Sequence, residues 1–439
     1  MTKTMFAGRK RTLGLAVAAA IGVGAANPAW AETEIEALKR ELAEQRVLLQ
    51  TLLAERQAEK AAAAKEPAAA PAVAAAAPAA PAVTIYGILD VGVEHITNIG
   101  AAGKNLTRVP GITATLPSRI GFKLNKEFKP GYAAIGTLEA GFNLDDGTQG
   151  QSGTPATSDR IFGRQLFVGL RTPAGSFTFG RQWSMLTQGM RGVDQLGPNI
   201  YALGSLDAYL PNSRYDNSLA WQHKFGSVSA GLAYSLGRDT SGGAPASGTC
   251  AGEQNNIADT QECRAWSAMV RYDSPRFGVA GAIDQVKGGT GATAFFFNGA
   301  APFAFADSGD TDTRTTLGGY ANFGDASIGA GWLGRKVDTN ATEVESDIYY
   351  VTASYKISPV IKIDGGIHRI TNDDQDRDAT LSAVRAFYTL DKGLDVYGQV
   401  GHITNSSKAS YGLSGAGAGT APAAGESQNG FMAGMRYIF

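Results

Sequence analysis

The sequence predicts an all-β protein, a 16-stranded antiparallel transmembrane β-barrel, with an N-terminal helical (coiled-coil) segment in front of it. Three observations predict this fold class. Short runs of alternating apolar and polar residues recur sixteen times between Val83 and Phe439, tight and long connections alternate between them, and the last run ends on an aromatic residue. An exposed apolar strand at a chain end invites aggregation, whereas in a closed barrel the last strand pairs with the first.

Residues 1–31 are predicted to be a secretory signal peptide. Basic residues at positions 3, 9, 10 and 11 precede an apolar run over 13–26, and the sequence Ala-Trp-Ala at 29–31 is a typical cleavage site. The apolar run is too short to span a bilayer as a helix. We therefore expect the mature protein to begin at Glu32 and to leave the cytoplasm.

Charge and hydropathy then limit the class of the mature protein. Removal of the leader leaves 35 basic and 40 acidic residues, and no later apolar run is long enough for a membrane-spanning helix. A net negative charge argues against a nucleic-acid partner. A membrane barrel has such a composition, because each of its strands presents only alternate residues to lipid.

Residues 32–60 follow a helical period. Alternating steps of three and four residues predict about three heptads of coiled coil with Ile35, Leu38, Leu42, Gln45, Leu49 and Leu52 along the seam. A coiled coil this short has only marginal stability alone. The segment is therefore either a helix associated with an oligomer or a single solvated, partly disordered helix. Residues 61–82 contain 15 alanines and 4 prolines, which predict an extended linker that lets the helix project into the periplasm.

Residues 83–439 change to a period of two. In the first run, for example, Ile85, Leu89 and Val93 alternate with Tyr86 and Asp90. A soluble sandwich or propeller would not explain the regular alternation of short turns and long loops. The predicted strands cover residues 84–94, 118–128, 131–143, 160–171, 175–183, 214–224, 227–237, 264–273, 277–287, 313–323, 325–335, 346–358, 360–371, 379–391, 394–404 and 429–439.

Four motifs and the C-terminus resemble the trimeric general porins of the Gram-negative outer membrane, above all those of beta-proteobacteria. Phe439 closes a Tyr-Ile-Phe end that is similar to the terminal assembly signal of that family. The motifs are Ser118–Lys123, Gly163–Leu170, Gly175–Arg181 and Arg214–Ser218. The resemblance covers residues 83–439 and implies a homotrimer in outer-membrane lipid and lipopolysaccharide. It does not cover the helix and linker.

The resemblance also implies a pore constriction. Residues 182–213 occupy the place where that family folds a loop inward, and they carry Asp194 and Asp207. The wall positions that match pore-facing arginines of the family are Arg119, Arg164, Arg181 and Arg214. Arginine suits such a wall because it remains charged and its stem packs along the strand.

Several of these assignments have alternatives. Strand alternation alone turns Arg119 and Arg214 into the pore, but it groups Arg164 with Leu166 and Val168, which would face lipid. Only the resemblance turns Arg164 inward. The two loop acids could equally cap turns.

The predicted function is passive diffusion of ions and small hydrophilic solutes through a water-filled channel. Four wall arginines against two loop acids predict a mild anion preference. The alternatives are a substrate-specific outer-membrane channel, or a porin whose N-terminal helix also tethers the envelope by contacting the cell wall.

The remaining reactive residues predict neither catalysis nor a cofactor. Cys250 and Cys263 lie close together in one long connection, and in an oxidising compartment they are expected to form a disulfide rather than free thiols or a metal pair. The four histidines fall on separate strands and outside known catalytic motifs. We therefore expect no enzymatic activity, no cofactor and no metal site.

Overall fold

The computed structural model describes residues 82–111, 115–150, 160–207, 209–210, 213–237, 259–290, 292–294, 303–415 and 419–439, together with five isolated residues of the N-terminal segment. Those five, Ala43, Val47, Gln50, Thr51 and Ala54, are helical. The rest of the predicted helical segment, the predicted signal peptide and residues 61–81 of the predicted linker lie outside the described residues. Residues 80–439 form one compact unit.

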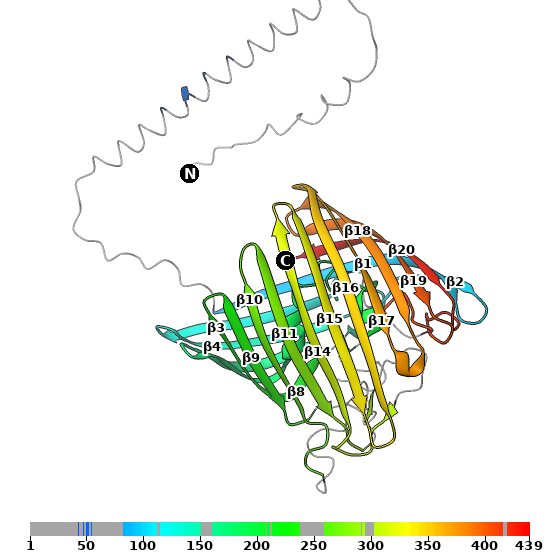
Figure 1. Cartoon of the computed structure of the whole chain (residues 1–439). Coiled ribbons are helices and arrows are strands. Elements are labelled where there is room, and N and C mark those ends of the chain that lie inside the picture. The colour runs from blue at the N-terminus through cyan, green and yellow to red at the C-terminus, as the bar shows by residue number, and fades with distance from the viewer. Residues whose placement is uncertain are drawn as a thin grey trace, which may run out of the picture. The chain divides into compact units, whose positions relative to one another are not determined.

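Sixteen antiparallel strands form the wall of this unit, as predicted from the sequence (Figure 1). They are β1 (Val83–Ile99), β3 (Arg119–Lys129), β4 (Tyr132–Phe142), β6 (Gln165–Thr172), β7 (Gly175–Trp183), β8 (Arg214–Phe225), β9 (Val228–Ser235), β10 (Ala265–Asp273), β11 (Phe277–Lys287), β14 (Thr311–Phe323), β15 (Ala326–Asp338), β16 (Glu343–Ser358), β17 (Ile361–Thr371), β18 (Ala379–Asp391), β19 (Leu394–Asn405) and β20 (Gln428–Ile438).

Four shorter strands accompany the wall. They are β2 (Lys104–Arg108), β5 (Gln149–Gly150), β12 (Thr293–Ala294) and β13 (Phe303–Ala304). β2 folds back on the end of β1, which continues to Ile99, five residues beyond the predicted end. β6 begins at Gln165, five residues later than predicted.

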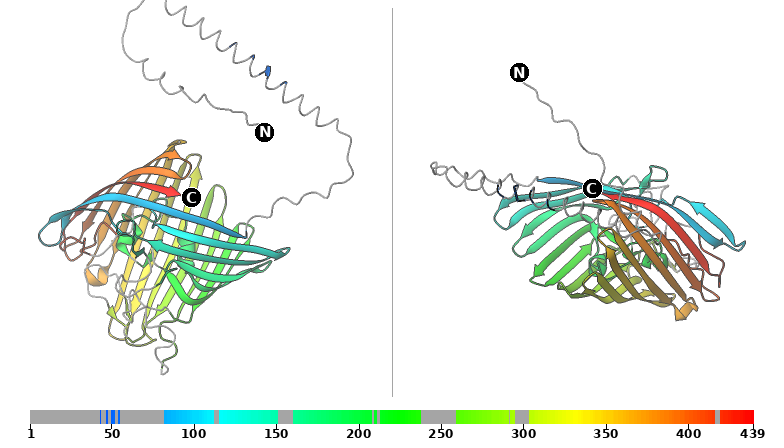
Figure 2. Two further views of the ribbon diagram at one scale, coloured as in Figure 1. Left: turned by 180° about the vertical axis from the view of Figure 1, so that it is seen from behind. Right: turned by 90° about the horizontal axis from the view of Figure 1, so that it is seen from above.

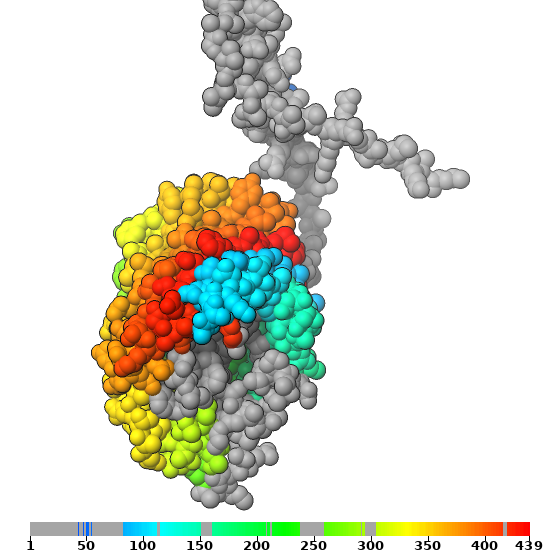
Figure 3. Space-filling model, turned by 90° about the vertical axis from the view of Figure 1, so that its right-hand side faces the viewer, coloured from blue at the N-terminus to red at the C-terminus, as the bar shows by residue number. Residues whose placement is uncertain are grey.

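The barrel closes between its first and last strands. Residues Ile88 to Ile96 of β1 pair with Ile438 to Gly430 of β20, and the beginning of β1 pairs with β3 on its other edge. The red end of the chain lies directly beside β1 in the views of Figure 2, and red and blue surfaces meet in Figure 3. Closure leaves no unpaired edge, which is the condition for a sheet that crosses lipid.

The two faces of the wall differ in polarity. Large apolar side chains such as Val93, Leu170 and Val351 are exposed on the outer face, whereas Asp90 and Glu94 are buried on the inner face of β1. This alternation gives the barrel an apolar belt for lipid and a polar interior. Among the described residues, no helix is long and apolar enough to cross a membrane.

Glycine and tyrosine pairs recur on the inner face. The directly opposed pairs are Tyr86 with Gly121, Tyr320 with Gly278, Tyr350 with Gly331 and Tyr397 with Gly434. A Cβ atom at each glycine would lie 2.3 Å or 2.4 Å from an atom of the opposite tyrosine. Each ring therefore covers the backbone of the neighbouring strand, an arrangement that helps a sheet to curve and fixes its register.

The connection between β7 and β8, residues 184–213, folds into the barrel, and we call it the inward loop. Its described part includes the short helices α2 (Met185–Met190) and α3 (Leu203–Leu206), more regular structure than the sequence predicted. Met185, Leu196 and Tyr201 of the loop share an apolar cluster with wall residues including Leu333. Burial of these side chains attaches the loop to the inner wall.

Candidate functional site: the interior of the barrel at the inward loop

Glu139 on β4 is the centre of one polar cluster on the inner wall. Its Oε1 accepts a hydrogen bond from Nε of Arg164 at 2.8 Å, and its Oε2 lies 3.8 Å from Nε of Arg119. Tyr86 donates its hydroxyl to the same Oε2 at 2.8 Å. One carboxylate thus holds two of the four predicted arginines, so that their charges are only partly compensated.

Arg164 reaches the interior because it precedes the strand. β6 begins at Gln165, so the side chain of Arg164 is not bound by the alternation that turns Leu166 outward. The side chain of Arg164 is 3% exposed and contacts Glu139, a residue of the inner face. Alternation alone grouped Arg164 with lipid-facing residues because the strand was predicted to begin at residue 160, five residues before the start of β6.

The other two predicted arginines occupy a neighbouring cluster. Nη1 of Arg181 lies 2.5 Å from Oδ1 of Asp216, and Nη2 of Arg160 lies 3.2 Å from Oδ2 of the same residue. The buried guanidinium of Arg214 lies 3.7 Å from the ring centroid of Trp183. This stacking replaces part of the hydration that the charge loses. Among the described residues, the contacts of these two clusters bring together five arginines and the carboxylates of Glu139 and Asp216.

Asp207 of the inward loop binds a different arginine of the wall, Arg314. Nε of Arg314 on β14 lies 2.7 Å from Oδ2 of Asp207, and Nη2 lies 3.2 Å from Oδ1. Arg314 also contacts Asp312, which in turn is bound by Arg335. Asp207 is 2% exposed, so its carboxylate joins the loop to the wall and presents little charge to water.

Asp194 lies at another contact between the loop and the wall. Its Oδ1 accepts the backbone N–H groups of Leu196 and Gly197, and its Oδ2 lies 3.5 Å from Nε2 of His368 on β17. His368 is fully buried and stacks on Tyr350 at 5.9 Å between ring centroids. Asp194 therefore caps a turn and packs against the wall, which was the alternative assignment for a loop acid.

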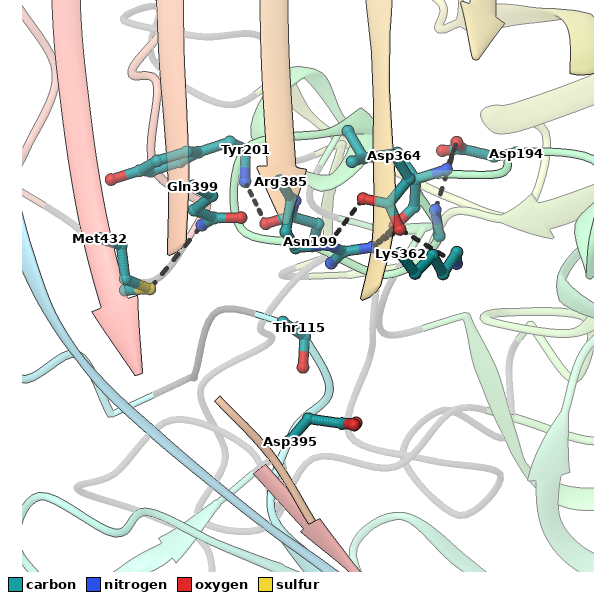
Figure 4. Close-up of polar contacts among 12 residues, drawn as sticks. Thr115, Asp194, Asn199, Tyr201, Lys362, Asp364, Arg385, Asp395, Gln399 and Met432 are labelled. Carbon is teal, nitrogen blue, oxygen red and sulfur yellow. Dashed lines mark hydrogen bonds and ion pairs between the residues drawn. The ribbon is translucent and has the colours of Figure 1, made fainter. Parts of the chain in front are cut away.

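A second wall arginine holds the same part of the loop. Nη2 of Arg385 donates to the carbonyl of Leu196 at 2.7 Å, while its Nε donates to Asp364 at 2.9 Å. Lys362 lies 3.1 Å from Asp364 on the side facing water. Figure 4 shows Asp194 and Tyr201 of the loop near this row of wall residues.

The structure brings the predicted arginines together in two adjacent clusters, but it joins neither loop acid to them. A charged loop residue that does lie close to them, Arg191, was not among the predicted site residues. Its guanidinium lies within electrostatic range of Arg119 and Glu139. Its position in the segment 182–213 was the only sequence signal, because a single loop arginine follows no pattern.

The structure describes one of the two cysteines of the predicted disulfide. Cys263 is fully buried and disulfide-bonded. Cys250 lies outside the described residues, so the pairing of these two cysteines stays a prediction. Among the residues that the structure describes, no group of three His, Cys, Asp or Glu side chains is arranged to hold a metal ion.

A closed barrel of sixteen strands with a polar inner face encloses an aqueous passage. These features define a membrane channel of the β-barrel class. Residues 61–408 match the model of the Gram-negative porin family, so the chain belongs to this family. Family and barrel indicate a channel rather than an enzyme, located in the outer membrane.

Comparison with individual proteins agrees with this assignment. An outer membrane porin protein of Bordetella pertussis is 26% identical over 221 residues, which are 47% of this chain and 54% of that protein. The chain thus matches about half the length of this relative.

Two solved structures are similar in fold. The anion-selective porin from Comamonas acidovorans has a TM-score of 0.66 at 21% identity, with 81% of this chain and 99% of that chain covered. OmpT of Vibrio cholerae in its trimer form has a TM-score of 0.56 at 17% identity, with the same coverage of 81% and 99%.

Proposed function

We propose that the protein is a passive-diffusion porin whose inward loop and wall arginines form a constriction with a mild anion preference. The observation that carries this proposal is the charge of the interior clusters. Among the described residues, the contacts around the predicted arginines bring together five arginines and two carboxylates, Glu139 and Asp216. Excess fixed positive charge lowers the energy of an anion in a narrow aqueous pore and raises that of a cation.

The position of the loop acids supports the same preference. Asp207 is paired with Arg314, and Asp194 is directed to backbone N–H groups and His368. Neither carboxylate is thus available to balance the wall arginines fully. The similarity of fold to a porin described as anion-selective agrees with this proposal.

Reversal potentials in a gradient of potassium chloride test the proposal. Purified full-length protein in a planar bilayer is expected to prefer chloride, and Arg119→Ala combined with Arg164→Ala is expected to move the reversal potential toward that of potassium. Cation selectivity of the native channel, or unchanged selectivity of the double variant, would contradict the proposal. Competing solutes in the same recordings distinguish a general porin from a substrate-specific channel.

The assembly that we propose is a homotrimer in outer-membrane lipid and lipopolysaccharide, with the helical segment on the periplasmic side. The existence of a trimer form of OmpT, which shares the fold, supports this proposal. Deletion of residues 32–82 separates the two roles proposed for the segment. Loss of trimers would indicate a coiled-coil clamp, whereas intact trimers with weakened attachment to the cell wall would indicate a tether.

A further inference from the structure

A cavity of about 930 Å³ lies inside the barrel between the inward loop and the wall strands β6 to β14. Gln188 and Arg191 line it from the loop, and Arg171 and Lys224 line it from the wall near the short turns that follow β6 and β8. Short turns mark the periplasmic end of an outer-membrane barrel. The cavity therefore lies on the periplasmic side of the loop. We call it the basic pocket.

The charges around the basic pocket are unequal. Arg171, Arg191, Lys224 and Arg271 line it together with a single carboxylate, Asp273. Nε and Nη2 of Arg271 bind both oxygens of Asp273, at 2.6 Å and 2.7 Å, so that this pair is balanced. Tyr320 also donates its hydroxyl to Asp273 at 2.8 Å, which fixes the pair against β14.

Within the described part of the chain, the other three cations of the pocket, Arg171, Arg191 and Lys224, form no direct ion pair. Arg171 donates to the neutral side chain of Asn125 at 2.8 Å, and Lys224 lies within electrostatic range of the already paired Asp273. Fixed cations that converge on water without partners lower the energy of an anion placed among them.

Arg271 of the wall also binds the inward loop at this pocket. Nη1 of Arg271 donates a hydrogen bond to the backbone carbonyl of Arg191, immediately after helix α2. The same guanidinium thus binds Asp273 on the wall and the loop carbonyl, so the basic pocket has a fixed boundary. Arg191 also lies within electrostatic range of Glu139 and Arg119, which places it between the proposed constriction and the pocket.

We propose that the basic pocket transiently binds small solutes with two or more negative charges as they pass between the constriction and the periplasmic end. This inference rests on the proposed channel function. The electrostatic attraction grows with the charge of the solute, so three unpaired cations favour a multivalent anion over chloride. The volume falls within the range of pockets for small organic molecules. Guanidinium groups match the oxygens of carboxylates and phosphates.

Single-channel recording with inorganic pyrophosphate as the probe tests this proposal. Addition to the side of the short turns is expected to interrupt the chloride current of the native full-length channel with a frequency that rises with concentration. Arg171→Gln combined with Lys224→Gln is expected to weaken pyrophosphate binding about tenfold at low salt, because two converging charges are lost. Lys392→Gln removes an exposed cation from another short turn and is expected to leave the interruptions unchanged.

The outcomes separate this proposal from the proposed function. Two results would contradict binding in the basic pocket while the proposed channel function stands. One is chloride selectivity without interruptions by pyrophosphate, and the other is interruptions that persist unchanged in the Arg171 and Lys224 double variant. Unchanged selectivity after Arg119→Ala and Arg164→Ala would instead overturn the constriction. Calorimetric titration of the detergent-solubilised protein with pyrophosphate gives the same comparison where a variant conducts poorly.

Discussion

Arg314 on the wall and Asp207 on the inward loop form a two-point ion pair inside the barrel, with Nε 2.7 Å from Oδ2 and Nη2 3.2 Å from Oδ1. Their side chains are only 1% and 3% exposed. The guanidinium also lies 4.2 Å from the ring centroid of Tyr209, two residues further along the loop. This pair joins the inward loop to the wall at β14.

Removal of Arg314 is expected to destabilise the loop and the barrel. In Arg314→Leu the carboxylate of Asp207 would stay buried without its counter-charge, which costs about 3–5 kcal/mol. Asp312 would retain Arg335 at 2.8 Å, so the loss falls mainly on the loop. The free energy of unfolding in urea measures the effect, and single-channel recordings should show a noisier current.

Arg369→Leu is the matched control for Arg314→Leu. The side chain of Arg369 is 54% exposed and lies 3.1 Å from Asp378. An exposed ion pair contributes less than about 1 kcal/mol, so this variant should unfold close to the native protein. Equal unfolding free energies for the two variants would show that the buried pair does not anchor the loop.

Glu139→Gln is expected to increase the preference for anions. The substitution keeps the shape of the side chain but removes the negative charge that Arg164 and Arg119 share. The reversal potential in a potassium chloride gradient should therefore move toward that of chloride. Glu343→Gln serves as the control, because Glu343 is 54% exposed and pairs with Lys336 at the other end of the wall. A shift toward cation selectivity in Glu139→Gln would contradict the proposed constriction.

The sequence predicted the wall better than the interior. The alternation of apolar and polar residues is a local signal, and it located all sixteen wall strands because each strand must present one face to lipid. The largest differences lie at strand ends such as Ile99 and Gln165. There the chain leaves the belt and the alternation no longer constrains it.

The ion pairs of the interior depend on contacts that no local pattern contains. Asp207 and Arg314 are 107 positions apart, and their pairing follows from the path of the loop through the barrel. Glu139 lies within the predicted strand 131–143, but nothing in the local sequence distinguishes it from other polar residues of the strands. Only the tertiary structure shows that it gathers Arg119, Arg164 and Tyr86 around one carboxylate.

The predicted disulfide between Cys250 and Cys263 is expected to stabilise the long connection before β10. In the loop-entropy estimate a bond across so short a segment contributes about 3 kcal/mol. Cys250→Ser combined with Cys263→Ser should therefore unfold at lower urea and lose its sensitivity to reducing agents, while its conductance stays native. Maleimide labelling after unfolding without a reducing agent checks the pairing. Labelling of the protein with both cysteines present would show free thiols and contradict the disulfide.

Phe439 and Gly87 are expected to be coupled in barrel closure. The backbone groups of the two residues exchange hydrogen bonds of 3.0 Å and 3.2 Å, and a Cβ atom at Gly87 would lie 2.3 Å from Cζ of Phe439. Gly87→Val should thus displace the ring and lower the fraction of folded, heat-resistant barrel. Phe439→Ala in the same chain should restore part of the folded fraction, with a coupling free energy between about 0.5 and 3 kcal/mol.

Gly398→Val is the control for Gly87→Val, because the nearest atom to a Cβ at Gly398 is 3.9 Å away. If both valine variants fold equally well, the ring of Phe439 does not constrain the closing strand.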